Sequence, residues 1–377
     1  MGRKPLLAWP RWLHAARRLA ARVTRPELGA GPLTAPVWCV GRDYGAQEAA
    51  AQQPFVGPAG DVLNDALRAA GLPRPAVRID NLVPRQPPAN DWARHAPGDV
   101  AWGAERLTGL LRAERPRVIV ALGGEAAAWL VGDAWPADEG IQALRGYLWD
   151  TRFGRVLTTV HPAACLREWT PWRALLDFDM RRAAAEAAAG APPLDEPTVT
   201  VVATRADADE LTRAAKGATL LSVDIENTHD CALSCVGFAV TPTHAWVVPD
   251  AEAWQHDLIR DLCESPTPKV LQNGQYDRFF LRRFVGITLR NQTVDTQLAW
   301  HALNPELAGK KAQVGNRKAS GRRTAKSLKF LASIYLRTPY WKQYAFASEH
   351  DQFVLCGRDA ANTLGIARKQ LAQLDAA

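Results

Sequence analysis

Two acids separated by one residue end an apolar, β-branched stretch, Leu220-Leu221-Ser222-Val223-Asp224-Ile225-Glu226. In a β-strand, residues i and i+2 project from the same face, so the Asp224 and Glu226 carboxylates would lie side by side. Neighbouring carboxylates repel each other and favour a cation between them, and Mg²⁺ and Mn²⁺ prefer such oxygen ligands. The sequence therefore indicates a cation site here, and the alternative is a strand end with two solvated acids.

Two later acids could join this pair. Asp277 follows the apolar run Lys269-Val270-Leu271 at the expected start of a helix, and Asp359 lies in a second expected helix near the end of the chain. We expect both carboxylates to face the site of Asp224 and Glu226.

A second set of polar side chains follows apolar strands in the first half of the chain. Asp43, Asn81 and His161 lie at or just beyond the ends of strands expected at 37–40, 77–83 and 156–160. The carboxyl ends of parallel strands usually form the functional site of an α/β fold. We therefore expect these three side chains near one another.

The elements that must position both sets alternate between strand and helix. Another buried strand is expected at 116–123, and an Ala/Gly/Pro-rich stretch ends near Pro197. The second module would open with strand 198–203, helix 205–216 and a meander that includes 236–240 and 245–248. The pattern predicts an α/β protein with two domains, each built on a sheet covered by helices. The expected organisation is a basic N-terminal helix at 1–30, a first domain at 31–188, a linker at 189–197 and a second domain at 198–377.

Charge is unevenly distributed along the 377 residues. Residues 1–30 hold seven Lys/Arg against one acid, and residues 309–329 hold eight Lys/Arg and no acid, although the net charge of the whole chain is only +7. Such basic patches favour contact with nucleic-acid phosphates, and the alternative is a pair of solvated segments. No apolar run is long enough to cross a membrane, and six scattered cysteines favour a reducing compartment.

Residues 35–180 resemble the uracil-DNA glycosylase superfamily, closest to its family 4. The motifs are Pro54-Phe55-Val56-Gly57 with Ala59-Gly60, Asn81-Leu82-Val83 with Pro87-Pro88, Val120-Ala121-Leu122-Gly123, Arg145-Gly146, and His161-Pro162 with Leu166-Arg167. The resemblance implies a three-layer α/β/α fold with a mainly parallel sheet.

The same resemblance implies roles for individual residues. Phe55 would stack on an extruded base that lies between Phe55 and His161, and Asn81 would read its edge, with Gly41 and Tyr44 also contacting the base. His161 would stabilise the departing anion, and Asp43 would position water. Leu166 and Arg167 would fill the vacated stack.

Two departures from family 4 stand out. The family's Gly-Glu-Ala-Pro-Gly is replaced by Gly41-Arg42-Asp43-Tyr44-Gly45, with Asp43 where family 1 enzymes carry their water-positioning acid. Family 4 also holds an iron–sulfur cluster through four cysteines, but the expected positions include Arg85 and Trp102. We therefore expect no iron–sulfur cluster.

Residues 198–375 resemble the DEDD 3′–5′ exonuclease superfamily, closest to the proofreading domain of family A DNA polymerases. Asp224-Ile225-Glu226, Asn273-x-x-Tyr276-Asp277 and Asp359-Ala360 match its three motifs, and Tyr340-Trp341-Lys342 also fits. The resemblance implies a ribonuclease H-like mixed sheet, and two Mg²⁺ or Mn²⁺ ions held by Asp224, Glu226, Asp277 and Asp359. Asn273 and Tyr276 would contact DNA, and the basic segment would grip phosphates through Lys310, Lys311, Arg322 and Arg323.

One position conflicts with an active nuclease. The third motif normally carries a Tyr or His four or five residues before its Asp, whereas Leu355 and Val354 stand there. Tyr344 or His350 could substitute.

The two resemblances together imply a bifunctional DNA repair or replication protein. It would excise uracil or a related modified base and degrade single-stranded 3′ ends. It would act in the cytoplasm, associated with the nucleoid of a bacterium or with phage DNA, with any DNA polymerase a separate chain and with no membrane contact. A DNA-binding or polymerase-associated module with impaired sites, and a glycosylase for another modified base, are the alternatives.

Overall fold

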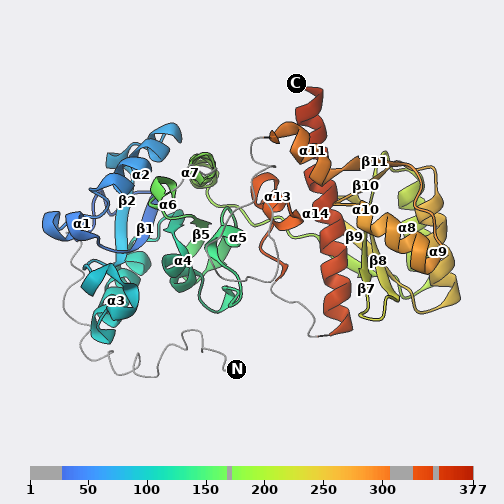
Figure 1. The fold of residues 1–377 in the computed structure, drawn as a ribbon, viewed down its shortest axis with the longest axis horizontal. Coiled ribbons are helices and arrows are strands. Elements are labelled where there is room, and N and C mark those ends of the chain that lie inside the picture. The colour runs from blue at the N-terminus through green and yellow to red at the C-terminus, as the bar shows by residue number, and fades with distance from the viewer. Residues whose placement is uncertain (1–27, 168–171, 306–325, 343–347, 377) are drawn as a thin grey trace. The chain divides into compact units, whose positions relative to one another are not determined.

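The computed structural model describes residues 28–167, 172–305, 326–342 and 348–376. The chain divides into two compact units, Met1–Pro193 and Leu194–Ala377 (Figure 1). Most of the predicted N-terminal helix and most of the basic segment at 309–329 lie outside the described residues. No helix within the described ranges is long and apolar enough to cross a membrane.

The N-terminal unit is built on a five-stranded sheet in the order β2-β1-β3-β5-β4. Four strands run parallel and β4 pairs antiparallel with β5. The strands are β1 (Val37–Asp43), β2 (Arg78–Val83), β3 (Val118–Leu122), β4 (Leu148–Thr151) and β5 (Gly154–Thr159). Strands β2 and β3 are buried along their whole length, which requires cover on both faces of the sheet.

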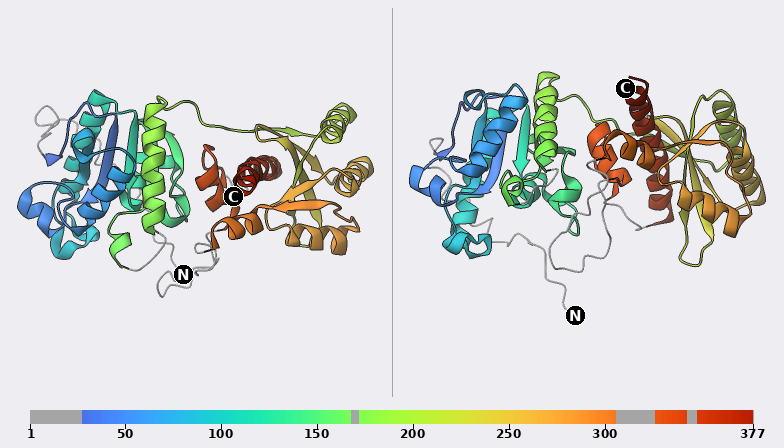
Figure 2. Two further views of the ribbon diagram at one scale, coloured as in Figure 1. Left: turned by 90° about the horizontal axis from the view of Figure 1, so that it is seen from above. Right: turned by 45° about the horizontal axis from the view of Figure 1, so that its top comes forward.

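Helices provide that cover (Figure 2). Helix α3 packs on β2, whereas α7 and α4 both pack on β1, β3 and β5. The helices of this unit are α1 (Ala46–Ala51), α2 (Pro58–Ala69), α3 (Pro97–Glu114), α4 (Gly124–Val131), α5 (Ile141–Leu144), α6 (Ala164–Arg167) and α7 (Trp172–Ala188). Short 3₁₀ turns lie at Arg74–Ala76, Pro88–Asn90, Trp92–Arg94 and Gly132–Ala134.

The C-terminal unit has a six-stranded mixed sheet in the order β11-β10-β7-β8-β9-β6. Strands β7, β8 and β9 form an antiparallel meander, and β10, β11 and β6 join it in parallel. The strands are β6 (Thr198–Val201), β7 (Leu221–Asn227), β8 (Leu233–Thr241), β9 (His244–Pro249), β10 (Lys269–Leu271) and β11 (Gln292–Asp295). The helices are α8 (Arg205–Lys216), α9 (Ala253–Glu264), α10 (Gln275–Phe280), the π-helix η8 (Leu281–Val285), α11 (Thr296–Leu303), α13 (Leu328–Tyr335) and α14 (Glu349–Asp375). The predicted fold class, an α/β protein with two sheets, is confirmed.

Helix α14 crosses the sheet and packs on strands β6 to β10 (Figure 1). Two glycines allow this close approach. A Cβ on Gly237 of β8 would lie 2.7 Å from the Cys356 carbonyl oxygen, and one on Gly357 of α14 would lie 2.6 Å from a Val199 methyl. The contact holds the middle of α14, including Asp359, beside the strand that carries Asp224.

Candidate functional sites

The first site lies where β1 and β2 end. Gly41 pairs with Asn81 in the parallel register of these strands. The Asn81 side chain is buried, and its Oδ1 has no hydrogen-bond partner among the described residues. A Cβ on Gly41 would lie 2.6 Å from that oxygen and 2.8 Å from the Phe55 ring. The structure therefore brings Gly41, Phe55 and Asn81 together and leaves a buried acceptor without a partner, which costs free energy unless a ligand supplies the donor.

Phe55 lies in a loop whose backbone is held by hydrogen bonds with side chains outside the loop. Its φ of 53° is unusual for a residue with a Cβ. The Arg74 guanidinium donates to the carbonyl oxygens of Phe55 at 3.0 Å and Pro54 at 2.7 Å. Glu48 accepts from the backbone N–H groups of Val56 and Gly57, at 3.2 and 3.1 Å. These contacts hold the backbone of the loop that carries Phe55.

His161 lies against Phe55, with ring centroids 5.5 Å apart and an interplanar angle of 30°. Its Nδ1 accepts a hydrogen bond of 3.2 Å from the Ala163 N–H. Burial, together with the positive charge of Arg42, lowers the pKa of His161 to about 4. At neutral pH the ring is therefore uncharged, and its proton is on Nε2 because Nδ1 is an acceptor.

The contact between these two rings bears on where an extruded base could bind. Stacked aromatic rings are about 3.4 Å apart, so a base lying between Phe55 and His161 would separate them by about 7 Å. At 5.5 Å the two rings instead pack on each other. A base would have to stack on one face of Phe55.

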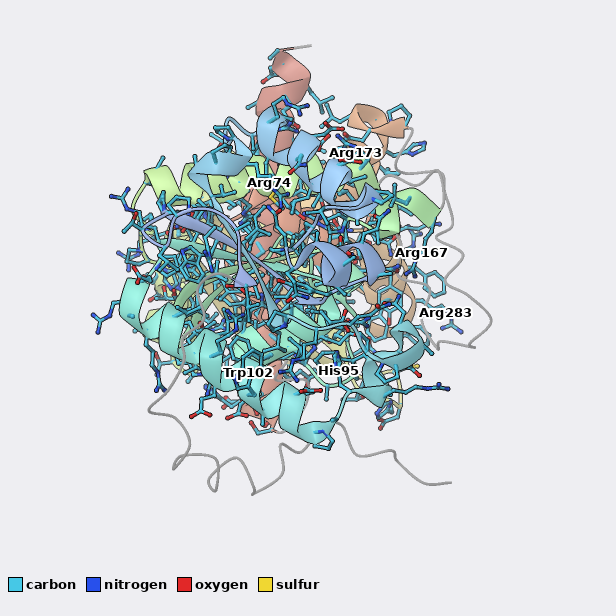
Figure 3. All side chains as sticks on the ribbon, turned by 90° about the vertical axis from the view of Figure 1, so that its left-hand side faces the viewer. Arg74, His95, Trp102, Arg167, Arg173 and Arg283 are labelled. Carbon is cyan, nitrogen blue, oxygen red and sulfur yellow. The ribbon has the colours of Figure 1, made fainter. Side chains whose placement is uncertain are left out.

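Asp43 has two cationic or polar neighbours that both bind its Oδ2. His95 Nε2 lies at 3.3 Å and Arg42 Nε at 3.1 Å, and Arg42 also bonds Glu125 at 3.1 Å. Burial raises the pKa of Asp43, against the lowering effects of Arg42 and His95. His95, which Figure 3 labels, was missed by the sequence analysis, since it lies in the irregular loop before α3.

The backbone of Asn81 is also held by a buried ion-pair network. Asp80 accepts from the Asn81 N–H at 2.8 Å, and Arg106 of α3 donates to the Asn81 carbonyl oxygen at 2.9 Å. Arg106 and Arg78 both pair with Asp80. The network fixes the Asn81 backbone. The role of Arg106 could not be predicted from the sequence, because Arg106 is distant from Asn81 along the chain and meets it only in the folded protein.

Tyr44, Leu166 and Arg167 were also proposed for the first site. Tyr44 is fully buried, its hydroxyl donates to the Leu28 carbonyl oxygen, and Asp80 and Arg106 are its charged neighbours. It therefore lies on the Asp80 side of β2, opposite Asn81, and this geometry argues against contact with a base. Leu166 and Arg167 are exposed on α6, five and six residues after His161.

Arg85 and Trp102 occupy positions at which family 4 cluster ligands were expected. The Arg85 guanidinium lies 5.1 Å from the centre of the Trp102 ring, a cation–π contact, and Arg85 also pairs with Asp99. Neither side chain can bind iron, and their contact fills this position.

The second site lies in the C-terminal unit. One carboxylate oxygen from each of Asp224, Glu226 and Asp359 can be chosen such that all lie within 4.8 Å of one another. These residues come from β7 and α14 and are distant in sequence. Asp277 is buried at the start of α10, and its charge also acts on Asp224.

The pKa values of three carboxyl groups at this site are raised above their ordinary values. Burial, then the charges of Asp359 and Asp277, raises the pKa of Asp224 well above its ordinary value. Burial and Asp359 raise the pKa of Glu226 to about 7, and burial raises that of Asp277 to about 7. Such a cluster is costly without a compensating cation.

Part of that compensation comes from the chain itself. Lys342 donates through Nζ to Asp359 Oδ2, and Trp341 donates through Nε1 to Asp359 Oδ1 at 2.6 Å. Burial lowers the pKa of Lys342, but Asp359 and Asp224 outweigh it and raise the pKa above its ordinary value. The Tyr340-Trp341-Lys342 motif thus brings a cation onto the acidic cluster.

Of the residues expected to contact DNA, Tyr276 is half exposed and donates to Asn227 Oδ1 at 2.8 Å, and the exposed Asn273 precedes α10 with a φ of 58°. Leu355 is buried, and its apolar side chain cannot orient water. His350 is exposed in the first turn of α14. Tyr344, Lys310, Lys311, Arg322 and Arg323 lie outside the described residues.

Known proteins match the N-terminal unit. Residues 28–187 match the family model of the uracil DNA glycosylase superfamily. The chain is 34% identical to the type-4 uracil-DNA glycosylase of Thermotoga maritima over 145 residues, which is 38% of this chain and 73% of the relative. The chain belongs to the uracil-DNA glycosylase superfamily. The type-4 enzyme of Archaeoglobus fulgidus is also 34% identical, over 37% of this chain and 70% of the relative.

Solved structures also resemble part of the chain, at low identity. The POL domain of Pol1 from M. smegmatis is 20% identical with a TM-score of 0.32, over 45% of this chain and 27% of that one. The catalytic core of RRP6 from Trypanosoma brucei is 16% identical with a TM-score of 0.36, over 49% of this chain and 51% of that one. The Nibbler EXO domain of Aedes aegypti is 16% identical with a TM-score of 0.34, over 48% of this chain and 93% of that one.

Proposed function

We propose that the N-terminal unit hydrolyses the bond between uracil, or a closely related pyrimidine, and deoxyribose in DNA. The observation that carries this proposal is the buried, unpartnered Oδ1 of Asn81 beside Gly41 and Phe55. Membership of the superfamily makes an extruded base the natural donor to that oxygen. An Asn side chain can accept from the ring N–H of uracil and donate to a uracil carbonyl oxygen.

The bond breaks between the sugar C1′ and the base nitrogen, and the base leaves as an anion. The neutral His161 is suited to stabilise that anion, because its Nε2–H can donate while its Nδ1 is held by Ala163. Asp43, oriented by His95 and Arg42 through one oxygen, would stabilise the cationic sugar and orient the water that bonds to C1′. The water loses one proton and the departing base anion takes up one, so the reaction is balanced.

We further propose that the C-terminal unit hydrolyses DNA from the 3′ end with the help of divalent metal ions. Three convergent carboxylates and a buried fourth make a ligand set of the kind that Mg²⁺ or Mn²⁺ prefers. Asp224, Glu226, Asp277 and Asp359 would hold two such ions. When bound, the ions would polarise the phosphodiester and provide the nucleophile at neutral pH. The chain itself contributes Lys342, whose ammonium neutralises part of the cluster and must share Asp359 with a metal.

A second function for the C-terminal unit is favoured by two observations. Leu355 offers no group to orient water, and both Asp359 oxygens already accept hydrogen bonds from Trp341 and Lys342. A unit impaired in these ways would bind DNA without degrading it.

The proposal assigns the two functions to two domains, at 31–188 and 198–377, joined by the linker 189–197. The protein would act on DNA in a bacterial cytoplasm or on phage DNA. The described residues give no support to a separate polymerase partner, and the proposal does not include one.

One pair of assays tests both functions. Alkali-labile sites formed in a uracil-containing oligonucleotide in EDTA would support the glycosylase. Shortening of a 3′-terminated strand in Mg²⁺ or Mn²⁺, lost in Asp224→Ala, would support the nuclease. Metal-independent DNA binding without shortening would favour the impaired unit.

A further inference from the structure

Three aromatic side chains are strongly exposed on one short segment of the C-terminal unit. Tyr276 is 50% exposed, Phe279 61% and Phe284 49%, all within α10 and η8. Among the described residues, only five large hydrophobic side chains are at least 49% exposed, namely these three, Leu166 and Leu298. Leu298, at 66%, lies in the first turn of α11. Such a concentration marks an interaction surface, because scattered single residues are the norm.

The aromatic rings form one connected group. Phe279 and Phe284 meet edge to face at 6.2 Å, Phe284 packs on the buried Phe280 at 5.2 Å, and Phe280 stacks with Tyr276 at 6.1 Å. The π-helical turn η8 changes the helical period, so that Arg282, Arg283 and Phe284 are all exposed in succession. π-helical turns inside helices are frequently found at functional sites.

Positive charge surrounds these rings. Arg278, Arg282 and Arg283 are exposed on the same segment, whose one acid, Asp277, is buried. The Arg283 guanidinium lies 5.5 Å from the centre of the Phe284 ring. Aromatic faces flanked by arginines are the arrangement on which single-stranded nucleic acids stack their bases while their phosphates are neutralised.

The segment also continues from the acidic site. Tyr276 is the neighbour of Asp277 in sequence, and its hydroxyl bonds Asn227, the residue after Glu226. Asp295 joins the start of α11 to the turn before α10, since it accepts from the N–H groups of Gly274 and Leu298. A strand with its end at the carboxylates could therefore run over these rings.

We propose that Tyr276, Phe279 and Phe284, with Arg278, Arg282 and Arg283, form a stacking platform for single-stranded DNA that leads to the acidic site. A second copy of the chain is the less suitable occupant, because the same three arginines would face one another across a symmetric interface. The platform deepens the proposed nuclease function, but its binding of DNA requires no metal and no hydrolysis.

The test uses the full chain, in EDTA, with a fluorescent thymidine oligonucleotide that carries 4-thiothymidine. Irradiation should crosslink the DNA to a peptide containing Phe279 or Phe284, and crosslinks confined to other peptides would overturn the proposal. The double variant Phe279→Ala/Phe284→Ala should weaken binding about 10-fold and remove this crosslink. Arg282→Gln/Arg283→Gln should lower the dependence of log affinity on log salt by about 1.4, since each phosphate contact contributes about 0.7.

Matched controls separate the platform from general effects. Leu374→Ala removes another exposed apolar side chain, and Arg260→Gln removes an exposed arginine of α9; both should leave crosslinking and salt dependence unchanged. Hydrolysis of bis(p-nitrophenyl) phosphate in Mn²⁺, a substrate too small to reach the platform, should be equal in wild type and in the double variant. Failure of that hydrolysis in both proteins would count against the nuclease alone. Monomerisation of a wild-type dimer by the double variant, with DNA binding unchanged, would overturn the platform.

Discussion

Lys342 donates through its Nζ to the Oδ2 of Asp359, so an ammonium group of the chain lies on the acidic cluster proposed to bind metal. The charges of Asp224 and Glu226 also act on this lysine. The contact neutralises part of a site that would otherwise hold several carboxylates in little water. It also means that a metal ion and Lys342 compete for Asp359.

Removal of this ammonium should therefore strengthen metal binding. We expect Lys342→Met to bind Mn²⁺ about tenfold more tightly than the wild type, a change of about 1.4 kcal/mol, as measured by titration calorimetry. Lys216→Met, at the exposed end of α8, is the matched control and should have no effect. Equal or weaker Mn²⁺ binding by Lys342→Met would show that the lysine supports the ion instead of competing with it.

Metal affinity should rise steeply with pH near neutrality. Glu226 and Asp277 both have a pKa of about 7, and each must lose its proton before it can bind an ion. Lowering the pH from 8 to 6 should thus weaken Mn²⁺ binding at least 10-fold, and Glu226→Gln should reduce the slope of this dependence. A flat profile between pH 6 and pH 8 would mean that these carboxylates are already ionised.

The pH profile of uracil release should depend on Asp43 and not on His161. Asp43 must be ionised to stabilise a cationic sugar, so activity should fall as the pH drops through its pKa, which burial raises above the ordinary value. His161 stays neutral down to about pH 4, because burial and the charge of Arg42 disfavour its protonated form. Asp43→Asn should lower the rate and flatten the acid limb, whereas His161→Gln should lower the rate and leave the limb in place. A limb that moves in His161→Gln would contradict these assignments.

The protein should fold without an iron–sulfur cluster in its N-terminal unit. The Arg85–Trp102 contact takes the place of two expected ligands and should stabilise the loop before α3. We expect Trp102→Leu to lower the free energy of unfolding by about 1 kcal/mol in urea denaturation, and Trp254→Leu, which removes a similar contact with Arg205 in the other unit, to act on that unit alone. Stoichiometric iron in the purified protein would contradict this expectation.

Local sequence patterns predicted much of the fold. The helix expected at 205–216 matches the bounds of α8, and the runs that contain Asp224 and Asn81 form the strands β7 and β2. These elements could be predicted because their periodicity and end residues are local properties. The antiparallel strand β4 was missed, since its four residues carry no clear alternation.

The partners of the site residues could not be predicted in the same way. His95 beside Asp43, Arg106 behind Asn81 and Trp341 on Asp359 are contacts between residues 18 or more positions apart. Such contacts depend on how the helices pack on the sheet. The residue types alone do not distinguish a position at a site from a position on the protein surface. The ring contact between Phe55 and His161 likewise follows from the loop geometry that Arg74 imposes.

The central claim is that the Asn81 side chain receives an extruded uracil. It is tested most directly by single-turnover release of uracil from a single-stranded oligonucleotide in EDTA, with the products weighed by mass spectrometry. Wild type should convert the strand to one that has lost only the base, and Asn81→Ala should slow this conversion at least 100-fold while keeping the wild-type melting temperature. An intact strand after incubation with excess wild-type protein, or equal rates for the two proteins, would contradict the account.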